Sequence, residues 1–475
     1  MTSRPQALIV VLLLWAAIYL PGLGSLPIKG EEGRRILPAI SMIESGDYLV
    51  PEVGGNAYFS KPPLINWLIA ASFKVSEVRN EWTARLPSAL SVLLVAIAFV
   101  TIARATLSPL GSSFAAIIWL TNAGMIEKGR LAEIEAVYVS LTALAIICWL
   151  SFWKSNRSIW FVWVPASIFL GLGWLAKGPL HLIFFYAIVI GVSWQSRNWR
   201  LLFHPAHLAG ILLMLGIFAA WAIPFAHATN STLVATKWTN QFSGRLTGSD
   251  FKFSSWIFNI PRGLAYFLPW TIFLLLIRFD EFQSDRRQLA RALAWGAAAP
   301  FVLVNLVPGA LPRYAMPALL PACWLLAMIL AQPDFILPGW LGGKPFSLQA
   351  RKRMVAAIAI IAVIGTGIYS LAIVPQLRNR FGIKQFADQI NHAVPPEEPI
   401  YALDPNYQPI FFYLKGKLIY ADQLNEVPAE ARFLLVRPER EQEVIESNRW
   451  APRQPHRIMR SSDYRKESIL LLKIE

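Results

Sequence analysis

The sequence contains few cysteines and few charged residues. Only two cysteines occur in 475 residues, Cys148 and Cys323, and both lie in apolar stretches. This excludes a disulfide framework and a metal site built from cysteines. Charged residues make up 15% of the chain, 55% of it is apolar, and the mean hydropathy is +0.45. Because a soluble protein carries more charge, this composition predicts a polytopic membrane protein.

Acidic residues are scarce relative to basic ones. The chain has 29 aspartates and glutamates against 44 lysines and arginines, which gives a formal charge of +15. In a soluble chain this excess would suggest nucleic-acid binding, but here much of it lies in short loops between apolar runs. We therefore expect anionic lipid head groups or lipid phosphates as partners, and no nucleic acid.

The apolar runs that are long enough to cross about 30 Å of hydrocarbon predict about eleven membrane spans. We place them near 7–24, 85–103, 111–126, 134–153, 159–176, 178–194, 207–226, 262–278, 292–308, 313–331 and 354–374. The first is expected to be a retained span, because no small-residue cleavage site follows it cleanly. The run 63–75 is too short to span and predicts a helix that lies in the membrane interface.

The basic residues of the short loops favour a cytoplasmic N-terminus, because positive charge collects on the inner side of the membrane. We therefore predict a multi-pass membrane protein with a cytoplasmic N-terminus. In this orientation the unusual polar segments all face outward: 25–84, 127–133, the break at Lys177, and 227–261.

The composition changes after about residue 375, where charged residues become frequent. Short apolar segments then alternate with turn-rich pieces and predict strands at 399–404, 409–414, 416–421, 431–439 and 468–475. The expected fold is mainly α. It consists of a transmembrane helix bundle over 1–375, with outer loops at 25–84 and 227–261, and a small α/β extracytoplasmic domain over 376–475.

The first polar group that could carry chemistry directly follows the first span. Glu31 and Glu32 precede Arg34 and Arg35. A carboxylate near an apolar surface can act as a general base, and neighbouring arginines can hold a phosphate. Taken alone, the group also fits charges that merely flank a membrane helix.

Two lysines stand beside prolines in the outward segments. Lys61 is followed by two prolines that stiffen the backbone, so its ammonium leaves an interfacial segment in a defined direction that suits a lipid phosphate. Lys177 stands at a break made by Gly178 and Pro179, where an ionisable group can line a polar cavity. Each lysine could equally be an anchor at the end of a helix.

For two further polar groups, the sequence supports a structural interpretation as well as a functional one. Glu135 begins the fourth predicted span, where the helix dipole itself favours a carboxylate. In the loop 227–261, Trp238, Asn240 and Arg245 offer stacking and hydrogen bonds to a sugar or a phosphate, although an ordinary polar loop also contains such residues.

The order of these groups resembles the GT-C class of polytopic glycosyltransferases that use lipid-linked sugars. The sequence is similar in particular to the bacterial aminoarabinose transferases and the dolichyl-phosphate-mannose protein mannosyltransferases. The resemblance covers roughly residues 10–330 and rests on EEGRRILPAISMIESGDYLVPEVGGNAYFSKPPLINWL, ARLPSAL, GRLAEIEA, LGWLAKGPL and PRYAMPALLP.

The resemblance implies an integral-membrane glycosyltransferase that moves a hexosyl or pentosyl group from a polyprenyl-phosphate sugar, with inversion, at the outer face of the inner (plasma) membrane. Lipid A, lipopolysaccharide, another envelope glycan or a protein could accept the sugar. The family's catalytic acidic position matches Glu31, and Lys61, Glu135 and Lys177 match three further family positions. We expect catalytic roles for Glu31 and Glu135, and substrate binding by Glu32, Arg34, Arg35, Lys61, Lys177, Asn240 and Arg245.

The expected chemistry needs charge stabilisation and positioning more than a strong acid, because the leaving group is already a phosphate. Lys61, with Lys177 or Arg245, would neutralise it. Family members with a metal often carry Glu before the Lys-Pro-Pro lysine and a His in the later loop, whereas this chain has Ser60 and no histidine in 228–261. No cofactor is expected, and a divalent metal has no support in the sequence.

Two other classes of protein remain as alternatives. A multi-pass transporter or flippase of a lipid-linked or anionic substrate would place charges deep in several spans and often shows internal repeats, and no repeat is evident. A non-catalytic scaffold would leave the clustering of polar residues on one side of the membrane without a reason.

Overall fold

The structure is a computed structural model. It describes residues 3–475 with the exception of 230–231, 233–234, 237, 241–242, 245–250, 252, 381, 406–408 and 463–467. The chain divides into two compact units. The helical unit comprises Met1–Pro21, Phe59–Ile65 and Leu86–Gly367, and the mixed unit comprises Gly22–Tyr58, Asn66–Arg85 and Ile368–Glu475.

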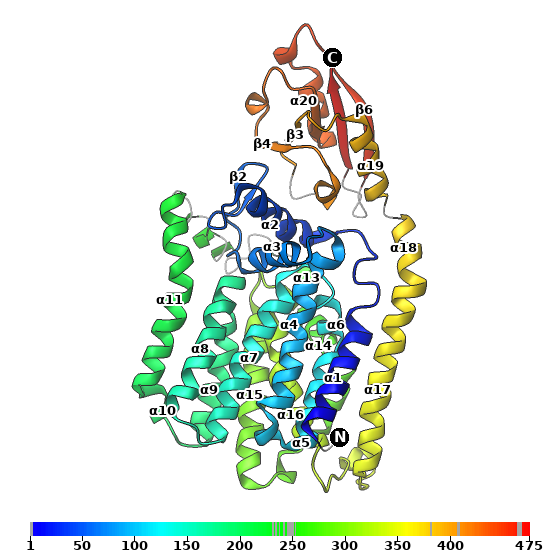
Figure 1. Ribbon diagram of the computed structural model, residues 1–475. Helices are drawn as coiled ribbons and strands as arrows, with labels where there is room; N and C mark the ends of the chain where they lie inside the picture. Colours follow the sequence, from blue (N-terminus) through cyan, green and yellow to red (C-terminus); the bar gives the residue numbers. More distant parts are fainter. Residues whose placement is uncertain are drawn as a thin grey trace. The chain divides into compact units, whose positions relative to one another are not determined.

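Long apolar helices build the helical unit. They are α1 (Arg4–Tyr19), α4 (Glu81–Thr101, from Leu86 on), α5 (Arg104–Thr121), α7 (Ile134–Lys154), α8 (Ile159–Ala176), α9 (His181–Gln195), α11 (Pro205–Ala228), α15 (Ser284–Leu306), α16 (Leu319–Leu330) and α17 (Leu348–Ile368). Helix α8 packs against α7 and α11, α9 against α15, and α5 against α16 (Figure 1). These helices are apolar over most of their surface, as lipid-embedded helices are.

Seven helical stretches among the described residues are long and apolar enough to cross a membrane. They are Glu81–Thr101, Ile134–Lys154, Ile159–Ala176, Pro205–Ala228, Ser284–Leu306, Pro312–Leu330 and Leu348–Arg378. The predicted multi-pass helix bundle is therefore confirmed, and the number of eleven spans stays a prediction.

The apolar run predicted as a single span over 262–278 does not form one continuous helix. The structure has instead a short helix, α14 (Asn259–Ala265), a turn, and the 3₁₀ helix η2 (Trp270–Leu276). Pro269 has no amide hydrogen to continue a helix through this point. The preceding carbonyls of Tyr266 and Leu268 instead accept hydrogen bonds from the first amides of α6 (Ala123–Lys128), at 2.7 and 2.8 Å.

The N-terminal part of the mixed unit contains two short helices and a hairpin. Helix α2 (Gly33–Ser45) ends at Gly46, which takes the left-handed conformation (φ 76°) that glycine adopts at a helix C-terminus. The predicted short helix is confirmed as α3 (Leu64–Ser76), and β1 (Glu52–Val53) pairs with β2 (Asn56–Ala57).

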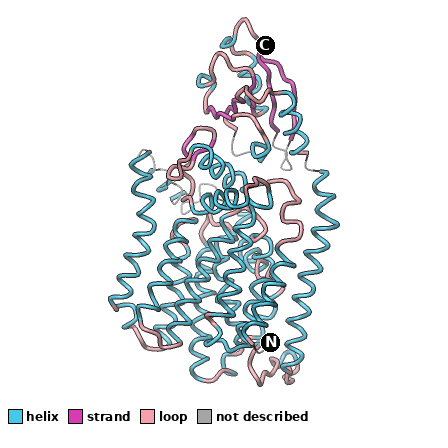
Figure 2. Tube along the Cα trace, viewed as in Figure 1, coloured by secondary structure: helices cyan, strands magenta, loops and turns pink. Residues whose placement is uncertain are grey.

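A five-stranded sheet forms the C-terminal region, which begins with α19 (Ile383–Ala393). The strand order is β4-β3-β5-β7-β6; the first three strands are parallel, and β7 is antiparallel to both of its neighbours. Figure 2 shows strands gathered in the C-terminal region. The bounds are β3 (Ile400–Leu403), β4 (Leu418–Ala421), β5 (Phe433–Val436), β6 (Pro455–Ser462) and β7 (Ser468–Ile474). The predicted α/β fold of this region is confirmed.

Two details of the sheet differ from the prediction. The strand expected at 409–414 is the 3₁₀ helix η7 (Pro409–Tyr413), which turns Ile410 and Phe411 into the core. Strand β6 was not predicted, because its sequence PHRIMRSS lacks the apolar alternation of a half-buried strand. It lies at the edge of the sheet and pairs only with β7, so the alternation is not required there.

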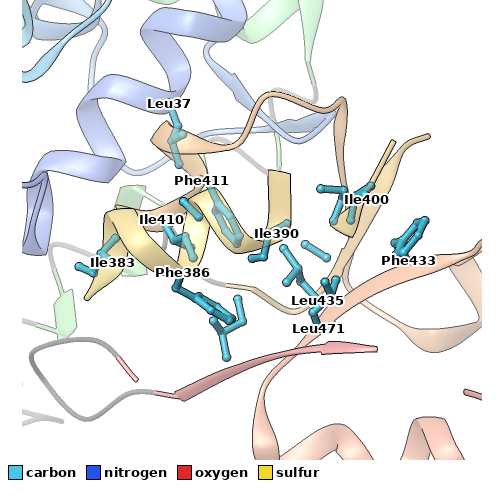
Figure 3. Packing of buried hydrophobic residues seen from close by; sticks show 14 of the residues in the cluster. Leu37, Ile383, Phe386, Ile390, Ile400, Ile410, Phe411, Phe433, Leu435 and Leu471 are labelled. Atoms are coloured by element: carbon cyan, nitrogen blue, oxygen red, sulfur yellow. The ribbon is translucent and has the colours of Figure 1, made fainter. Parts of the chain in front are cut away.

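A hydrophobic core joins the N-terminal and C-terminal parts of the mixed unit. Leu37 of α2 and Val53 of β1 pack with residues of α19, η7 and the sheet, among them Phe386 and Phe411 (Figure 3). Segments about 350 residues apart in sequence therefore share one core.

Candidate functional site

Glu135 lies in the first turn of α7, where two cations hold its side chain. Its Oε1 atom is 3.3 Å from Nζ of Lys177 and 3.1 Å from Nε of Arg313. Lys177 directly follows α8, and Arg313 lies in the 3₁₀ helix η4 (Pro312–Ala318). The structure thus brings together two predicted residues, Glu135 and Lys177, and adds an arginine that sequence reasoning missed.

Two tyrosine rings complete this group, which we call the Glu135 cluster (Glu135, Tyr138, Lys177, Arg313 and Tyr314). Nζ of Lys177 lies 5.2 Å from the ring centroid of Tyr138 and 4.6 Å from that of Tyr314. The side chains of Glu135 and Lys177 are about nine-tenths buried, and that of Arg313 is 26% exposed. A lysine and an arginine thus share one carboxylate oxygen, and both of these side chains are types that bind phosphate oxygens.

The backbone explains why Lys177 points away from a helix end. Helix α8 stops at Ala176, Gly178 has a φ of +125° that other residues rarely adopt, and Pro179 cannot continue the helix. The break predicted from the sequence is confirmed, and it places the ammonium beside the start of α7.

A second set of ion pairs anchors the segment that leads to Glu135. Lys128, at the end of α6, lies 2.9 Å from a carboxylate oxygen of Glu127 and 3.1 Å from one of Glu133. Burial acts to lower the pKa of Lys128, but the two carboxylates outweigh it and hold the pKa above its ordinary value. Lys128 therefore links α6 to the start of α7 through its ion pair with Glu133.

Aromatic side chains of the helical unit pack around Phe59, two residues before Lys61. The Trp238 indole donates a 2.9 Å hydrogen bond to the carbonyl oxygen of Phe59. The ring of Phe225 lies 5.8 Å from that of Phe59 and stacks on Trp221 at 4.7 Å. Lys61 itself is half-buried. The predicted role of Lys61 toward a lipid phosphate stays a prediction.

Asn240 and Arg245 are the other two residues predicted in the loop 227–261. Asn240 is exposed, two residues after Trp238. Arg245 lies outside the described residues. Their expected roles stay predictions.

Glu31 lies in the mixed unit and is paired with both predicted arginines. Its Oε2 atom is 3.5 Å from Nη1 of Arg34 and 3.8 Å from Nη2 of Arg35. Arg35 is buried and donates a 2.6 Å hydrogen bond to the hydroxyl of Tyr58, whereas the Glu31 side chain is 26% exposed. Glu31 is thus a partly exposed carboxylate whose orientation is set by two arginines.

Glu32 has a different environment from its neighbour. Its side chain is completely buried, and Arg85 binds both carboxylate oxygens, at 2.7 Å through Nε and 2.9 Å through Nη2. The remaining hydrogen bonds of Arg85 go to the carbonyl oxygens of Leu23, Leu26 and Pro27. The sequence analysis did not single out Arg85. Its position among apolar residues in ARLPSAL was the available signal, because an arginine in such surroundings is buried only when it is paired.

No group of three or more histidine, cysteine, aspartate or glutamate side chains in the described part of the chain could hold a metal ion. The predicted residues fall into two sets. The helical unit contains Lys61, Glu135, Lys177 and Asn240, and the mixed unit contains Glu31, Glu32, Arg34 and Arg35.

The fold defines the class of protein. The structure superposes on the crystal structure of ArnT from Cupriavidus metallidurans bound to undecaprenyl phosphate with a TM-score of 0.72 and 18% sequence identity, over 98% of this chain and 97% of that chain. The apo form of the same protein gives a TM-score of 0.71. The chain therefore has the GT-C membrane fold, as expected.

The sequence comparisons identify the particular group of relatives. A family model for dolichyl-phosphate-mannose-protein mannosyltransferase matches residues 60–223. An undecaprenyl phosphate-alpha-4-amino-4-deoxy-L-arabinose arabinosyl transferase of Pseudomonas fluorescens is 28% identical over 339 residues, 69% of this chain. Its Pseudomonas aeruginosa counterpart is 25% identical over 338 residues, 70% of this chain. The resemblance to the aminoarabinose transferase and protein mannosyltransferase group is confirmed.

The matched regions span 57% and 60% of the length of these two relatives. The activity of the whole relatives therefore enters only as a proposal.

Proposed function

We propose that the protein is an integral-membrane glycosyltransferase. It would transfer a sugar from a polyprenyl-phosphate donor to a cell-envelope acceptor at the outer face of the inner membrane. The observation that carries this proposal is the Glu135 cluster, in which a lysine and an arginine share one carboxylate beside two tyrosine rings, within a membrane helix bundle. This group suits a donor that combines a phosphate with a sugar ring.

In the proposed reaction, Glu31 accepts the proton of the acceptor hydroxyl as its oxygen attacks the anomeric carbon. The bond between that carbon and the phosphate oxygen breaks, and polyprenyl phosphate leaves with the electron pair. Lys61 stabilises the negative charge on this phosphate, and attack from the opposite face inverts the anomeric carbon.

The Glu135 cluster supports a refined role for Glu135. Because its Oε1 atom pairs with both Lys177 and Arg313, we propose that Glu135 fixes these two cations for binding of the donor. Glu135 would then act on the reaction indirectly, by holding Lys177 and Arg313 where they bind the donor. Arg85 binds both carboxylate oxygens of Glu32, so Glu32 itself is not available to a substrate. Because Glu32 is thereby fixed and is the neighbour of Glu31, we propose that it positions Glu31.

The relatives suggest which donor to test first. Their names specify undecaprenyl phosphate 4-amino-4-deoxy-L-arabinose, so we propose this compound as the donor, with lipid A, lipopolysaccharide, another envelope glycan or a protein as acceptor. We further propose a cytoplasmic N-terminus and an extracytoplasmic C-terminal domain over 376–475, from the distribution of basic residues.

The test is release of free polyprenyl phosphate by the purified protein in liposomes from a panel of polyprenyl-phosphate sugars. The wild type should turn over at least one donor. Glu31→Gln should lower kcat about 10²- to 10⁴-fold, the range of general base catalysis. Lys61→Ala and Arg313→Ala should each lower kcat/KM about tenfold or more, since each removes a cation that binds phosphate.

A matched control is Arg34→Ala, which removes the more exposed of the two arginines beside Glu31 and should have a smaller effect than Glu31→Gln. Undiminished turnover in Glu31→Gln and Lys61→Ala would contradict the assigned residues. No turnover of any donor by the wild type would favour the transporter or the scaffold.

A further inference from the structure

The segment that carries Glu31 is held by residues distant in sequence, and one of them belongs to the C-terminal region. The hydroxyl of Tyr413, in η7, accepts a 2.7 Å hydrogen bond from the amide of Ile28 and donates a 2.8 Å hydrogen bond to Oε1 of Glu81. Ile28 is completely buried and lies three residues before Glu31. All of these residues lie in the mixed unit.

The surroundings keep this hydroxyl in place. Lys384 of α19 forms an ion pair with the same Oε1 atom of Glu81, and its ammonium lies 5.2 Å from the centroid of the Tyr413 ring. The side-chain amide of Asn391 donates a 2.9 Å hydrogen bond to the carbonyl oxygen of Tyr413. Burial, and then the Glu81 carboxylate, raise the pKa of Tyr413 well above its usual range, so the hydroxyl retains its proton.

The same segment is held at other points by Arg85. This guanidinium binds the carbonyl oxygens of Leu23, Leu26 and Pro27 as well as the carboxylate of Glu32. Glu81 and Arg85 are four residues apart on α4 and so lie on one face of that helix. Residues 23–32, which include Glu31, are therefore held from α4 by Arg85 and from the C-terminal region by Tyr413.

We propose that Tyr413 is a positioning residue for the transfer reaction: by holding the Ile28 amide it fixes the segment that presents Glu31. The C-terminal region is then part of the catalytic apparatus through this contact. The inference rests on the proposed function of Glu31. A hydrogen bond from a buried amide costs free energy when its partner is removed, so loss of the hydroxyl loosens the segment.

The first measurement is hydrogen exchange of the full-length protein in detergent, with mass analysis of the peptides that cover residues 23–37. Tyr413→Phe keeps the ring and its packing but removes the hydroxyl. Amides of this segment should exchange faster in the variant, because local opening becomes easier. The control is Tyr401→Phe, on β3 of the five-stranded sheet, whose ring packs against a separate hydrophobic cluster that includes Leu434 and Trp450. It should leave the segment unchanged.

The second measurement is the steady-state kinetics of polyprenyl phosphate release. Tyr413→Phe should lower kcat about five- to tenfold, as expected for loss of one buried hydrogen bond, while KM for the donor changes less than about twofold. A purely structural defect would instead lower the amount of active protein. The active fraction is therefore measured by titration with the donor in a single turnover.

Faster exchange in residues 23–37 together with a lower kcat, both absent from Tyr401→Phe, would support the inference. A wild-type kcat in Tyr413→Phe would overturn it, whether or not the exchange changes. If Tyr413→Phe does not fold, Lys384→Met replaces it, since this half-exposed residue pairs with Glu81. It should lower kcat about twofold in the same direction, and an unchanged kcat would again overturn the inference.

The two proposals fail in different ways. If the wild type releases no polyprenyl phosphate from any donor, the proposed function fails and the inference fails with it. If the wild type is active and Tyr413→Phe matches it, only the positioning role is overturned.

Discussion

At the scale of single residues, two adjacent carboxylates have different environments. Glu31 is partly exposed between two arginines, whereas Glu32 is completely buried with both oxygens bound to Arg85. The sequence shows only two glutamates in a row, and each could be the base. Burial separates them, because a carboxylate that is enclosed by a guanidinium cannot also reach an acceptor hydroxyl.

The first prediction concerns this buried pair. Glu32→Gln should lower the free energy of unfolding by about 3–5 kcal/mol, because Arg85 is left as a buried charge without its anion. Thermal unfolding of the purified protein in detergent measures the effect. The control is Glu44→Gln, which removes an exposed ion pair with Arg79 and should change stability by less than about 1 kcal/mol. Equal losses in the two variants would contradict a structural role for Glu32.

At the scale of elements, prolines and glycines decide where the helices and strands end. Pro269 divides an apolar run that is long enough to span, and Pro179 with Gly178 ends α8 at Lys177. In the mixed unit, Gly54 forms the turn between β1 and β2 with a φ of +61°, and its carbonyl accepts a 2.8 Å hydrogen bond from the amide of Tyr420. The hairpin is thereby tied to β4 of the sheet.

The second prediction tests this contact between the hairpin and β4. A side chain at Gly54 would bring its Cβ to 2.2 Å from the ring of Tyr420, whereas a Cβ at Gly55 meets nothing within 4 Å. Both residues have positive φ, so each alanine carries a conformational cost of about 1–2 kcal/mol. Gly54→Ala should therefore destabilise the protein clearly more than Gly55→Ala in the same thermal unfolding assay. If Gly55→Ala were as harmful, the contact with Tyr420 would contribute nothing.

At the scale of the whole molecule, the chain passes repeatedly between the two compact units. Residues 22–58 and 66–85 join the C-terminal region, although each is followed in sequence by part of the helical unit. The mixed unit therefore depends on both ends of the chain, since its core contains Leu37 and Val53 as well as the sheet.

The third prediction concerns membrane orientation. With the proposed topology, a cysteine at Glu430 should react with a membrane-impermeant maleimide in spheroplasts, and one at Asn156 only after permeabilisation. Both positions are exposed, and the native Cys148 and Cys323 are buried, so the background should be low. The opposite pattern of labelling would reverse the orientation.

The sequence by itself determined the helix bundle, the change of composition toward the C-terminus, and most of the candidate residues. These follow from local properties, because apolar length sets which segments can enter a membrane and prolines and glycines set where they end. The sequence also indicated the relation to lipid-phosphate glycosyltransferases, because that relation rests on short motifs that follow one another in the same order along the chain.

Only the tertiary structure decided which charges meet. The pairing of Arg313 with Glu135, of Arg85 with Glu32, and of Tyr413 with Ile28 joins residues between 53 and 385 positions apart. No local pattern encodes such contacts, because they depend on how helices and sheet pack, and the strength of each ion pair depends on the burial that this packing creates. Glu31 and Glu32 differ for this reason alone.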